Sequence, residues 1–361
     1  MRSLAKDVRP PGVPTVSTPA LVVDLDIVDA NVAAMARLLE GTNKTVRPHV
    51  KTHRTPELAR RQLGGLAVGL TCATVGEAES MAEAGFEDLL IANEVVDHAK
   101  IDRVATMAQR ASMTVAVDAL APAEALSRSA VRAGVTVGVL IDVDILLHRC
   151  GVGSVGEALD LAAAVERLPG IEMRGIMGYE GRVRLSDPDR ETHISGAYGA
   201  LSSTARALRE AGFRVDTVSA AGTSTIREAL ADPDITEIQA GVYALMEPEL
   251  LVMNLPFRCA VSLRGTVISR HPGRIVLDTG RRVVGMEYGA PTPIGFEAHS
   301  IVMGDEHATI TMDDPLPELG SQVALVPGQV RTTFNLHDHV WVVRGGEVVD
   351  RWPISARGSS Q

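Results

Sequence analysis

A strand-like run followed by a helix-like run recurs along most of this chain. The strand-like runs are short and rich in Val, Ile and Leu, and helical stretches separate most of them. The predicted strands cover residues 45–50, 66–72, 88–93, 113–118, 137–144, 173–179, 215–221 and 236–242. Eight such units within roughly 210 residues are typical of a (β/α)8 barrel. A doubly wound open sheet is the α/β alternative, but no Gly-rich dinucleotide-binding turn favours it.

The sequence on either side of the predicted barrel differs from it in composition and residue pattern. Residues 1–17 are Pro-rich and are expected to form an N-terminal arm, and a strand is expected within 18–27. The barrel is expected over residues 28–255. Residues 256–361 alternate in short β-branched runs broken by Gly, which predicts a mostly β C-terminal domain.

Composition narrows the classes of function. The 361 residues are 45% hydrophobic, which is enough for a sizeable core. The net charge of −10 argues against nucleic acid or an anionic membrane as the main partner. No apolar run approaches membrane-spanning length, and the first residues lack the apolar core of a signal peptide. Cys72, Cys150 and Cys259 are scattered, so we expect reduced thiols and a cytoplasmic protein.

The segment "RPHVKTH" places Lys51 between His49 and His53, where the first predicted barrel strand ends. If the strand continued, all three side chains would share one face, because side chains alternate along a strand. Neighbouring positive charge lowers the pKa of a lysine, and a neutral lysine is a nucleophile. Two alternatives are a solvated rim lysine and a pair of metal-binding histidines, although no carboxylate lies close by in sequence.

Four other features follow predicted strands, at the barrel end where catalytic groups collect. They are Arg149 in "HRCGV", Tyr179 in "MGYEGR", the "GTST" run at 222–225, and Tyr243. Three of them have a structural alternative: a rim ion pair for Arg149, core packing for Tyr179, and a helix cap for "GTST". An amine, an anion-binding turn and an arginine at one barrel mouth together indicate a pyridoxal 5'-phosphate (PLP) site.

Several of these segments carry a family resemblance. "TPALVVDLDIVDAN", "RPHVKTH", "GLTCATVGEAESMAEAG", "HRCGV", "GTST" and "EIQAGVYALME" resemble the D-threonine aldolase and D-serine dehydratase family, fold-type III PLP enzymes built like alanine racemase. The resemblance covers almost the whole chain. It implies a homodimer, with the 18–27 strand joined to the C-terminal β domain.

The resemblance also implies roles for particular residues. Lys51 would hold the PLP aldehyde, with His49 beside it, and Arg149 would lie near the ring nitrogen. Tyr179 would flank the cofactor. Gly222, Thr223 and Ser224 would surround the phosphate together with Tyr243.

The chain departs from the family pattern where a divalent metal is expected. Family members bind the metal through His and Cys (or Asp) in a "P-x-H-x-C-x-T-x-N" stretch, which here reads "PGQVRTTFN". Gln329 and Arg331 occupy the ligand positions, and neither is a useful metal ligand. Arg182 stands where the family has a histidine. We therefore expect no metal at this position. The alternative is relocation to His337 and His339, which would share a face if they lay on one strand.

The sequence favours a PLP-dependent lyase of the aldolase type, acting without a metal on a β-hydroxy-α-amino acid of D configuration. Arg331 would supply a fixed positive charge, and Gln329 a hydrogen bond, at the substrate β-hydroxyl. One alternative is a PLP-dependent amino-acid racemase or epimerase, which needs only removal of the α proton. Another is an ammonia-lyase similar to D-serine dehydratase. A non-catalytic PLP carrier fits least, because of the β domain.

Overall fold

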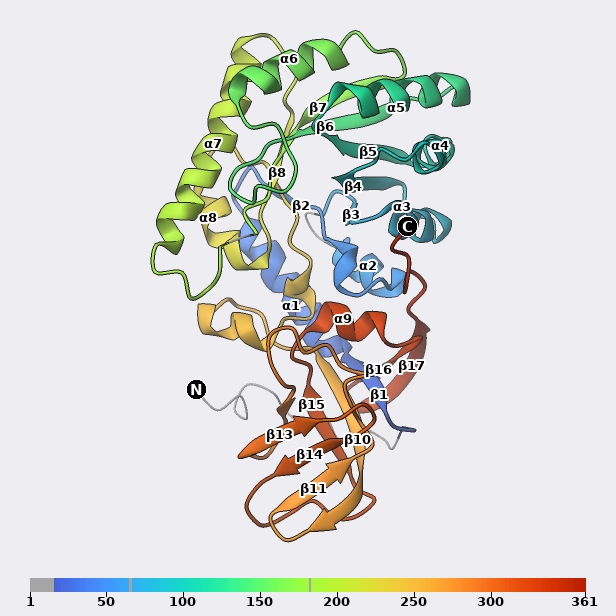
Figure 1. Cartoon of the computed structure of the whole chain (residues 1–361), viewed down its shortest axis with the longest axis vertical. Coiled ribbons are helices and arrows are strands. Elements are labelled where there is room, and N and C mark those ends of the chain that lie inside the picture. Colours follow the sequence, from blue (N-terminus) through green and yellow to red (C-terminus); the bar gives the residue numbers. More distant parts are fainter. Residues whose placement is uncertain (1–15, 65–66, 182) are drawn as a thin grey trace. The chain divides into compact units, whose positions relative to one another are not determined.

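The computed structural model describes residues 16–64, 67–181 and 183–361. The first fifteen residues of the expected N-terminal arm, and Arg182, lie outside the described residues. The chain divides into two compact units (Figure 1). The barrel unit comprises residues 38–51, 62–241 and 359–361, and the β unit comprises residues up to 37, 52–61 and 242–358. These boundaries differ from the expected ones: most of the first helix and residues 242–255 belong to the β unit.

The barrel unit contains an eight-stranded parallel sheet in the order β2-β9-β8-β7-β6-β5-β4-β3. Its strands are β2 (Thr45–Val46), β3 (Leu70–Cys72), β4 (Asp88–Glu94), β5 (Ser112–Val117), β6 (Val137–Asp142), β7 (Ile171–Met177), β8 (Thr217–Ala220) and β9 (Glu237–Ile238). Isolated parallel bridges, Val46 to Ala67 and His49 to Thr71, join the first and last strands of this order. The predicted α/β barrel followed by a β domain is confirmed.

Six helices alternate with the strands of the barrel unit. They are α3 (Val75–Glu83), α4 (His98–Met107), α5 (Leu120–Ala133), α6 (Val155–Val165), α7 (Arg190–Glu210) and α8 (Ile226–Ala231). Figure 1 shows them outside the sheet. Thr74 and Ser154 begin α3 and α6 by accepting a hydrogen bond from the backbone N–H three residues later, which is ordinary N-capping.

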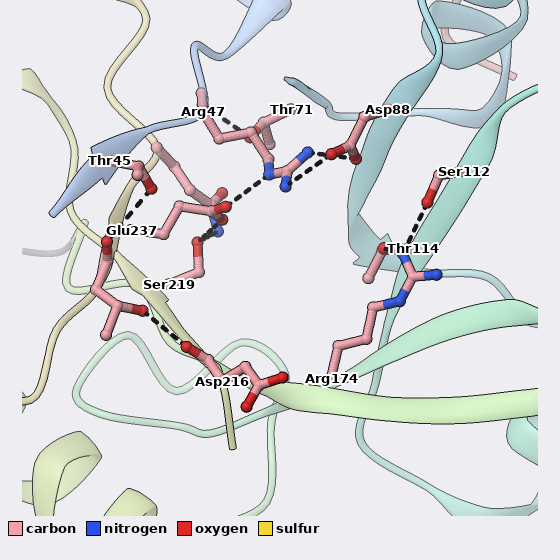
Figure 2. A network of polar contacts seen from close by, with 12 residues as sticks. Thr45, Arg47, Thr71, Asp88, Ser112, Thr114, Arg174, Asp216, Ser219 and Glu237 are labelled. Carbon is pink, nitrogen blue, oxygen red and sulfur yellow. Dashed lines mark hydrogen bonds and ion pairs between the residues drawn. The ribbon is translucent and has the colours of Figure 1, made fainter. Parts of the chain in front are cut away.

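A buried polar network holds the barrel together where its sheet closes (Figure 2). Arg47 Nε donates to Glu237 Oε2 on β9 at 2.8 Å, and Arg47 Nη1 donates to Asp88 Oδ1 on β4 at 2.7 Å. The Thr71 hydroxyl on β3 donates to the Arg47 carbonyl at 2.9 Å. One guanidinium therefore ties together strands from both sides of the closure, which fixes the end of β2 that leads to Lys51.

The β unit is built on a second sheet. Its long path runs β13-β14-β11-β10-β1-β16-β17, and β15 pairs with both β10 and β12. The strands are β1 (Ala20–Asp24), β10 (Val261–His271), β11 (Arg274–Leu277), β12 (Thr292–Pro293), β13 (Ser300–Met303), β14 (Ala308–Thr311), β15 (Gln322–Val326), β16 (His339–Arg344) and β17 (Glu347–Pro353). Strand β1 thus lies between β10 and β16, and both of these neighbours are far from β1 in sequence.

Three helices accompany the second sheet. Helix α1 (Leu25–Leu39) begins in the β unit and leads into the barrel unit, while α2 (Pro56–Gln62) and α9 (Val330–Asn335) pack by their buried residues into the β unit core. That core includes Leu21, Leu58 and Phe334, which are at most 1% exposed. No helix among the described residues is long and apolar enough to cross a membrane.

Candidate active site

Lys51 lies at the end of the barrel unit segment that follows β2. Only Thr45–Val46 forms strand, His49 makes a single bridge to Thr71, and Val50–Thr52 forms a 3-10 turn. The expectation that His49, Lys51 and His53 share one strand face is wrong, because Pro48 and the turn end the alternation. His53 is fully buried in the β unit, where its ring packs edge-on against Phe334 with centroids 6.5 Å apart.

The half-buried Lys51 amine lies near Tyr179, which follows β7. Lys51 Nζ is 5.6 Å from the centroid of the Tyr179 ring. The Tyr179 ring also lies near Gly222, because a Cβ added to Gly222 would stand 3.7 Å from the ring atom Cε2 and from the hydroxyl oxygen. The residues after β2, β7 and β8 therefore converge at one end of the barrel, where Tyr179 lies near both the amine and the turn.

The turn after β8 is fastened by several side chains. Gly222 N donates to Thr225 Oγ1 at 3.1 Å and to Glu180 Oε1 at 3.3 Å. Thr225 Oγ1 also donates to Glu180 Oε1 at 2.5 Å. Arg190, from the start of α7, donates to the Ser224 carbonyl. The turn is thus held in shape by groups from β7 and α7 as well as by its own hydroxyl.

Arg149 lies in the exposed part of the loop after β6, and its charge acts on a group of acidic side chains. Asp142, at the end of β6, is 6% exposed and hydrogen-bonds with Glu94 at the end of β4. Polar atoms of Glu94, Asp118 and Cys150 lie within 4.8 Å of one another. Burial, and then Glu94, raise the pKa of Asp142 to about 8, so the Asp142 carboxyl group keeps its proton at neutral pH.

The two positions that replace the expected metal ligands lie at the start of α9 in the β unit. The side chain of Gln329 is buried and caps α9 by accepting a hydrogen bond from Thr332 N at 3.3 Å. Arg331 Nη2 lies 3.6 Å from Glu247 Oε2 and donates to the Tyr288 hydroxyl at 2.7 Å. Glu247 is 2% exposed, and its burial raises its pKa while the Arg331 charge lowers it. Arg331 is therefore not a solvated surface residue.

The remaining predicted residues have separate surroundings. Tyr243 is fully buried in the β unit, with its ring centroid 5.6 Å from that of Phe257. His337 lies before β16 rather than on it. The expectation that His337 and His339 share a strand face is therefore wrong. His337 Nε2 lies 2.8 Å from the Val283 carbonyl oxygen, whereas His339 is exposed and contacts Arg351.

Three buried carboxyl groups were missed by reasoning from sequence: Glu180, Glu247 and Asp142. Asp142 and Glu180 end or directly follow a strand already predicted to point at the site, whereas Glu247 does not. The available signal for Glu180 was its place after Tyr179, where alternation turns it to the opposite side from the tyrosine. The partner of Glu247 is Arg331, which is distant in sequence, so no local pattern predicts this pair.

The barrel unit has the donor set that PLP requires. It offers a half-buried primary amine, an aromatic ring beside that amine, and a hydroxyl-bearing turn in contact with the same ring. An aldehyde needs the amine, and a phosphate needs backbone N–H groups and hydroxyls. The residues present therefore fit this cofactor.

Comparison with known proteins gives concordant matches over both units. Residues 23–247 match the alanine racemase N-terminal domain, and residues 260–343 match the putative serine dehydratase domain. The chain is 36% identical to a D-threonine aldolase of Arthrobacter sp, covering 96% of this chain and 94% of that protein. It is 30% identical to a 3-hydroxy-D-aspartate aldolase of Paracoccus denitrificans, covering 95% and 92%. The crystal structure of a D-threonine aldolase from Filomicrobium marinum superposes with a TM-score of 0.91 at 36% identity, covering 96% and 97%.

Proposed function

Because this chain belongs to the D-threonine aldolase and D-serine dehydratase family, whose enzymes depend on PLP, we propose that it is itself a PLP-dependent lyase of the aldolase type. Its substrate would be a β-hydroxy-α-amino acid of D configuration. The observation that carries this assignment is the convergence of Lys51, Tyr179 and the Gly222 turn at one barrel end, in a chain similar over its whole length to two aldolases.

We assign the cofactor to residues of the barrel unit and to Tyr243. Lys51 would bind the aldehyde, and Tyr179 would flank the ring. Gly222, Thr223, Ser224 and Tyr243 would bind the phosphate. His49, which is 7% exposed, would pack near the amine. Arg149 would approach the ring nitrogen; the raised pKa of Asp142, on which the Arg149 charge acts, limits the negative charge around it.

Bound PLP withdraws electrons from the α carbon of an amino acid, which allows a bond to that carbon to break. The residues of this chain would handle the proton of the β-hydroxyl group and the negative charge on the β oxygen. Lys51 Nζ, once free of the cofactor, would accept the proton of the β-hydroxyl as the Cα–Cβ bond breaks, so that the β carbon leaves as an aldehyde. The electron pair of that bond stays with the α carbon, to which Lys51 would return the proton, and glycine would then leave. Tyr179 would keep the amine in position for this transfer.

We propose that the reaction proceeds without a divalent metal at positions 329 and 331. A guanidinium repels a divalent cation, and the Gln329 side chain already caps α9. Arg331 would instead stabilise negative charge that develops on the β oxygen. Its pairing with Glu247 and Tyr288 supports a fixed position for this charge.

The racemase and dehydratase alternatives use the same cofactor residues. The match of residues 260–343 to the putative serine dehydratase domain specifically favours dehydration as the second candidate. A homodimer and a cytoplasmic location are further proposals. All three cysteines are free thiols, which is consistent with a reducing compartment.

Product analysis separates these functions. The purified protein, loaded with PLP, is incubated with D- and L-β-hydroxy amino acids, with and without chelator. We expect glycine and an aldehyde from D substrates only, unchanged by the chelator. An oxo acid with ammonia identifies a dehydratase, an inverted amino acid identifies a racemase, and no turnover of any substrate refutes the lyase assignment.

A further inference from the structure

Glu180 is a buried carboxyl group directly behind the turn that follows β8. It is 1% exposed and follows Tyr179 in the chain. One of its oxygens, Oε1, accepts hydrogen bonds from Gly222 N at 3.3 Å and from Thr225 Oγ1 at 2.5 Å. The two partners flank Thr223 and Ser224, so a single carboxyl oxygen holds both ends of the turn.

The charges of the groups around Glu180 bear on whether its carboxyl group is ionised. Its hydrogen-bond partners among the described residues are neutral: the backbone N–H of Gly222 and the Thr225 hydroxyl. Its other oxygen, Oε2, is buried without a hydrogen-bond partner in the described part of the chain. Arg190, the nearest cation that fastens the turn, is already paired with Glu228 of α8, with Arg190 Nη1 2.6 Å from Glu228 Oε1. Arg182 lies outside the described residues. A carboxylate here would face the anion that the turn is proposed to bind, with neutral partners.

A neutral acid resolves this conflict. The carbonyl oxygen of a protonated carboxyl group still accepts two hydrogen bonds, while the proton resides on Oε2, which is buried without a hydrogen-bond partner among the described residues. Burial raises the pKa of Glu180, in opposition to its hydrogen bonds, and so favours the protonated form. Burial also raises the pKa of Tyr198 well above its ordinary value, so that the phenol stays neutral.

We propose that Glu180 is a positioning residue for cofactor phosphate, which holds the Gly222–Thr225 turn as a neutral acid rather than as a carboxylate. The inference rests on the proposed function, since it requires that PLP bind in the barrel. It adds a specific requirement: the turn needs the hydrogen-bond acceptor of Glu180 but does not need its charge.

Comparing PLP with pyridoxal, which lacks the phosphate, isolates this role. Affinities of the cofactor-free protein for both probes are measured by absorbance titration in the wild type, Glu180→Gln and Glu180→Ala. Glu180→Gln keeps the acceptor and should preserve the preference for PLP over pyridoxal. Glu180→Ala should reduce that preference about tenfold or more, as expected for loss of a hydrogen bond that orders a charge-binding turn. Glu77→Gln is the control, since Glu77 is also buried and accepts a backbone N–H, from Ala73.

A pH series tests the protonation state. As the pH rises, the wild type should lose its preference for PLP while Glu180→Gln keeps it, because only the wild type gains a negative charge behind the turn. The ionisation of the phosphate itself is common to both proteins.

Three results would overturn the inference: an equal loss for both probes in Glu180→Ala, a loss in Glu180→Gln as large as in Glu180→Ala, or parallel pH profiles. Failure of the wild type to bind PLP at all would instead refute the proposed function.

Discussion

Lys51 Nζ lies 5.6 Å from the centre of the Tyr179 ring, and the same ring lies 3.7 Å from the position that a Cβ on Gly222 would take. Three chain segments that are distant in sequence therefore present an amine, an aromatic ring and a turn to one place at the barrel end. This arrangement has the components of a cofactor site, and the predictions below test its parts separately.

The first prediction concerns the turn. Thr223→Val removes a hydroxyl from a residue that is 5% exposed and keeps its shape. We expect PLP binding to weaken by about 1.5–3 kcal/mol, the usual value for a hydrogen bond to a charged group. Thr279→Val is the matched control, because Thr279 is fully buried in the β unit. Unchanged cofactor affinity in Thr223→Val would favour a plain structural role for the turn.

The second prediction separates two roles of Arg331. Arg331→Ala should reduce turnover on the order of a hundredfold, with little change in cofactor affinity, if its charge stabilises the β oxygen. It should also destabilise the β unit by about 3 kcal/mol or less, because Glu247 is left buried without its cation and Arg331 is itself 28% exposed.

The double variant Arg331→Ala/Glu247→Gln separates these effects. The glutamine keeps the acceptor for Val330 N and removes the uncompensated charge. The melting temperature should return toward that of the wild type, while turnover stays low. Recovery of both would show that Arg331 acts only through the stability of the β unit.

The third prediction concerns metal. The purified protein should carry no stoichiometric divalent ion, and its activity should survive a chelator. The double variant Gln329→His/Arg331→Cys is expected to gain a metal-binding site, because imidazole and thiolate replace an amide and a guanidinium. Elemental analysis checks the metal content of both proteins, and an activity assay with a chelator checks the metal independence of the wild type. Zinc or manganese that is lost together with activity would contradict the prediction and direct attention to His337 and His339.

The fourth prediction concerns pH. The pKa of Asp142 is about 8 in the folded chain, against 3.8 ordinarily. The folded state therefore holds this proton more tightly than the unfolded state does. The contribution of Asp142 to stability is complete below about pH 4 and is lost as the pH rises toward 8.

Asp142→Asn should remove this dependence. The melting temperature of the cofactor-free wild type, minus that of Asp142→Asn, should fall between pH 5 and pH 8. A constant difference over this range would mean that the carboxyl group does not retain its proton.

Much of the fold could be predicted from local sequence. All eight barrel strands were predicted, because short β-branched runs separated by helical periodicity are a local signal. The end of β2 was not: "RPHVKTH" was extended as a strand, whereas β2 stops at Val46 and Lys51 lies in a 3-10 turn. Pro48 disfavours continued strand pairing, and the contacts of Arg47 that fix this end come from Asp88 and Glu237.

The candidate site was predictable only in part. Lys51 and Tyr179 could be identified from their places after predicted strands. Glu180 and Glu247 could not, because their roles depend on partners that the fold brings near, such as Thr225 and Arg331. Gln329 was assigned from its position in a motif, and the capping bond that it makes in α9 depends on a helix that the sequence did not indicate.

The most direct test is to reduce the PLP-loaded protein with borohydride, which makes a lysine-bound cofactor permanent, and to map the modified peptide by mass spectrometry. We expect a protein that is yellow before reduction and that carries, after reduction, one phosphopyridoxyl group per chain on Lys51, with no such label in Lys51→Ala. A cofactor trapped on another lysine, or no trapped cofactor in the wild type, would contradict this expectation.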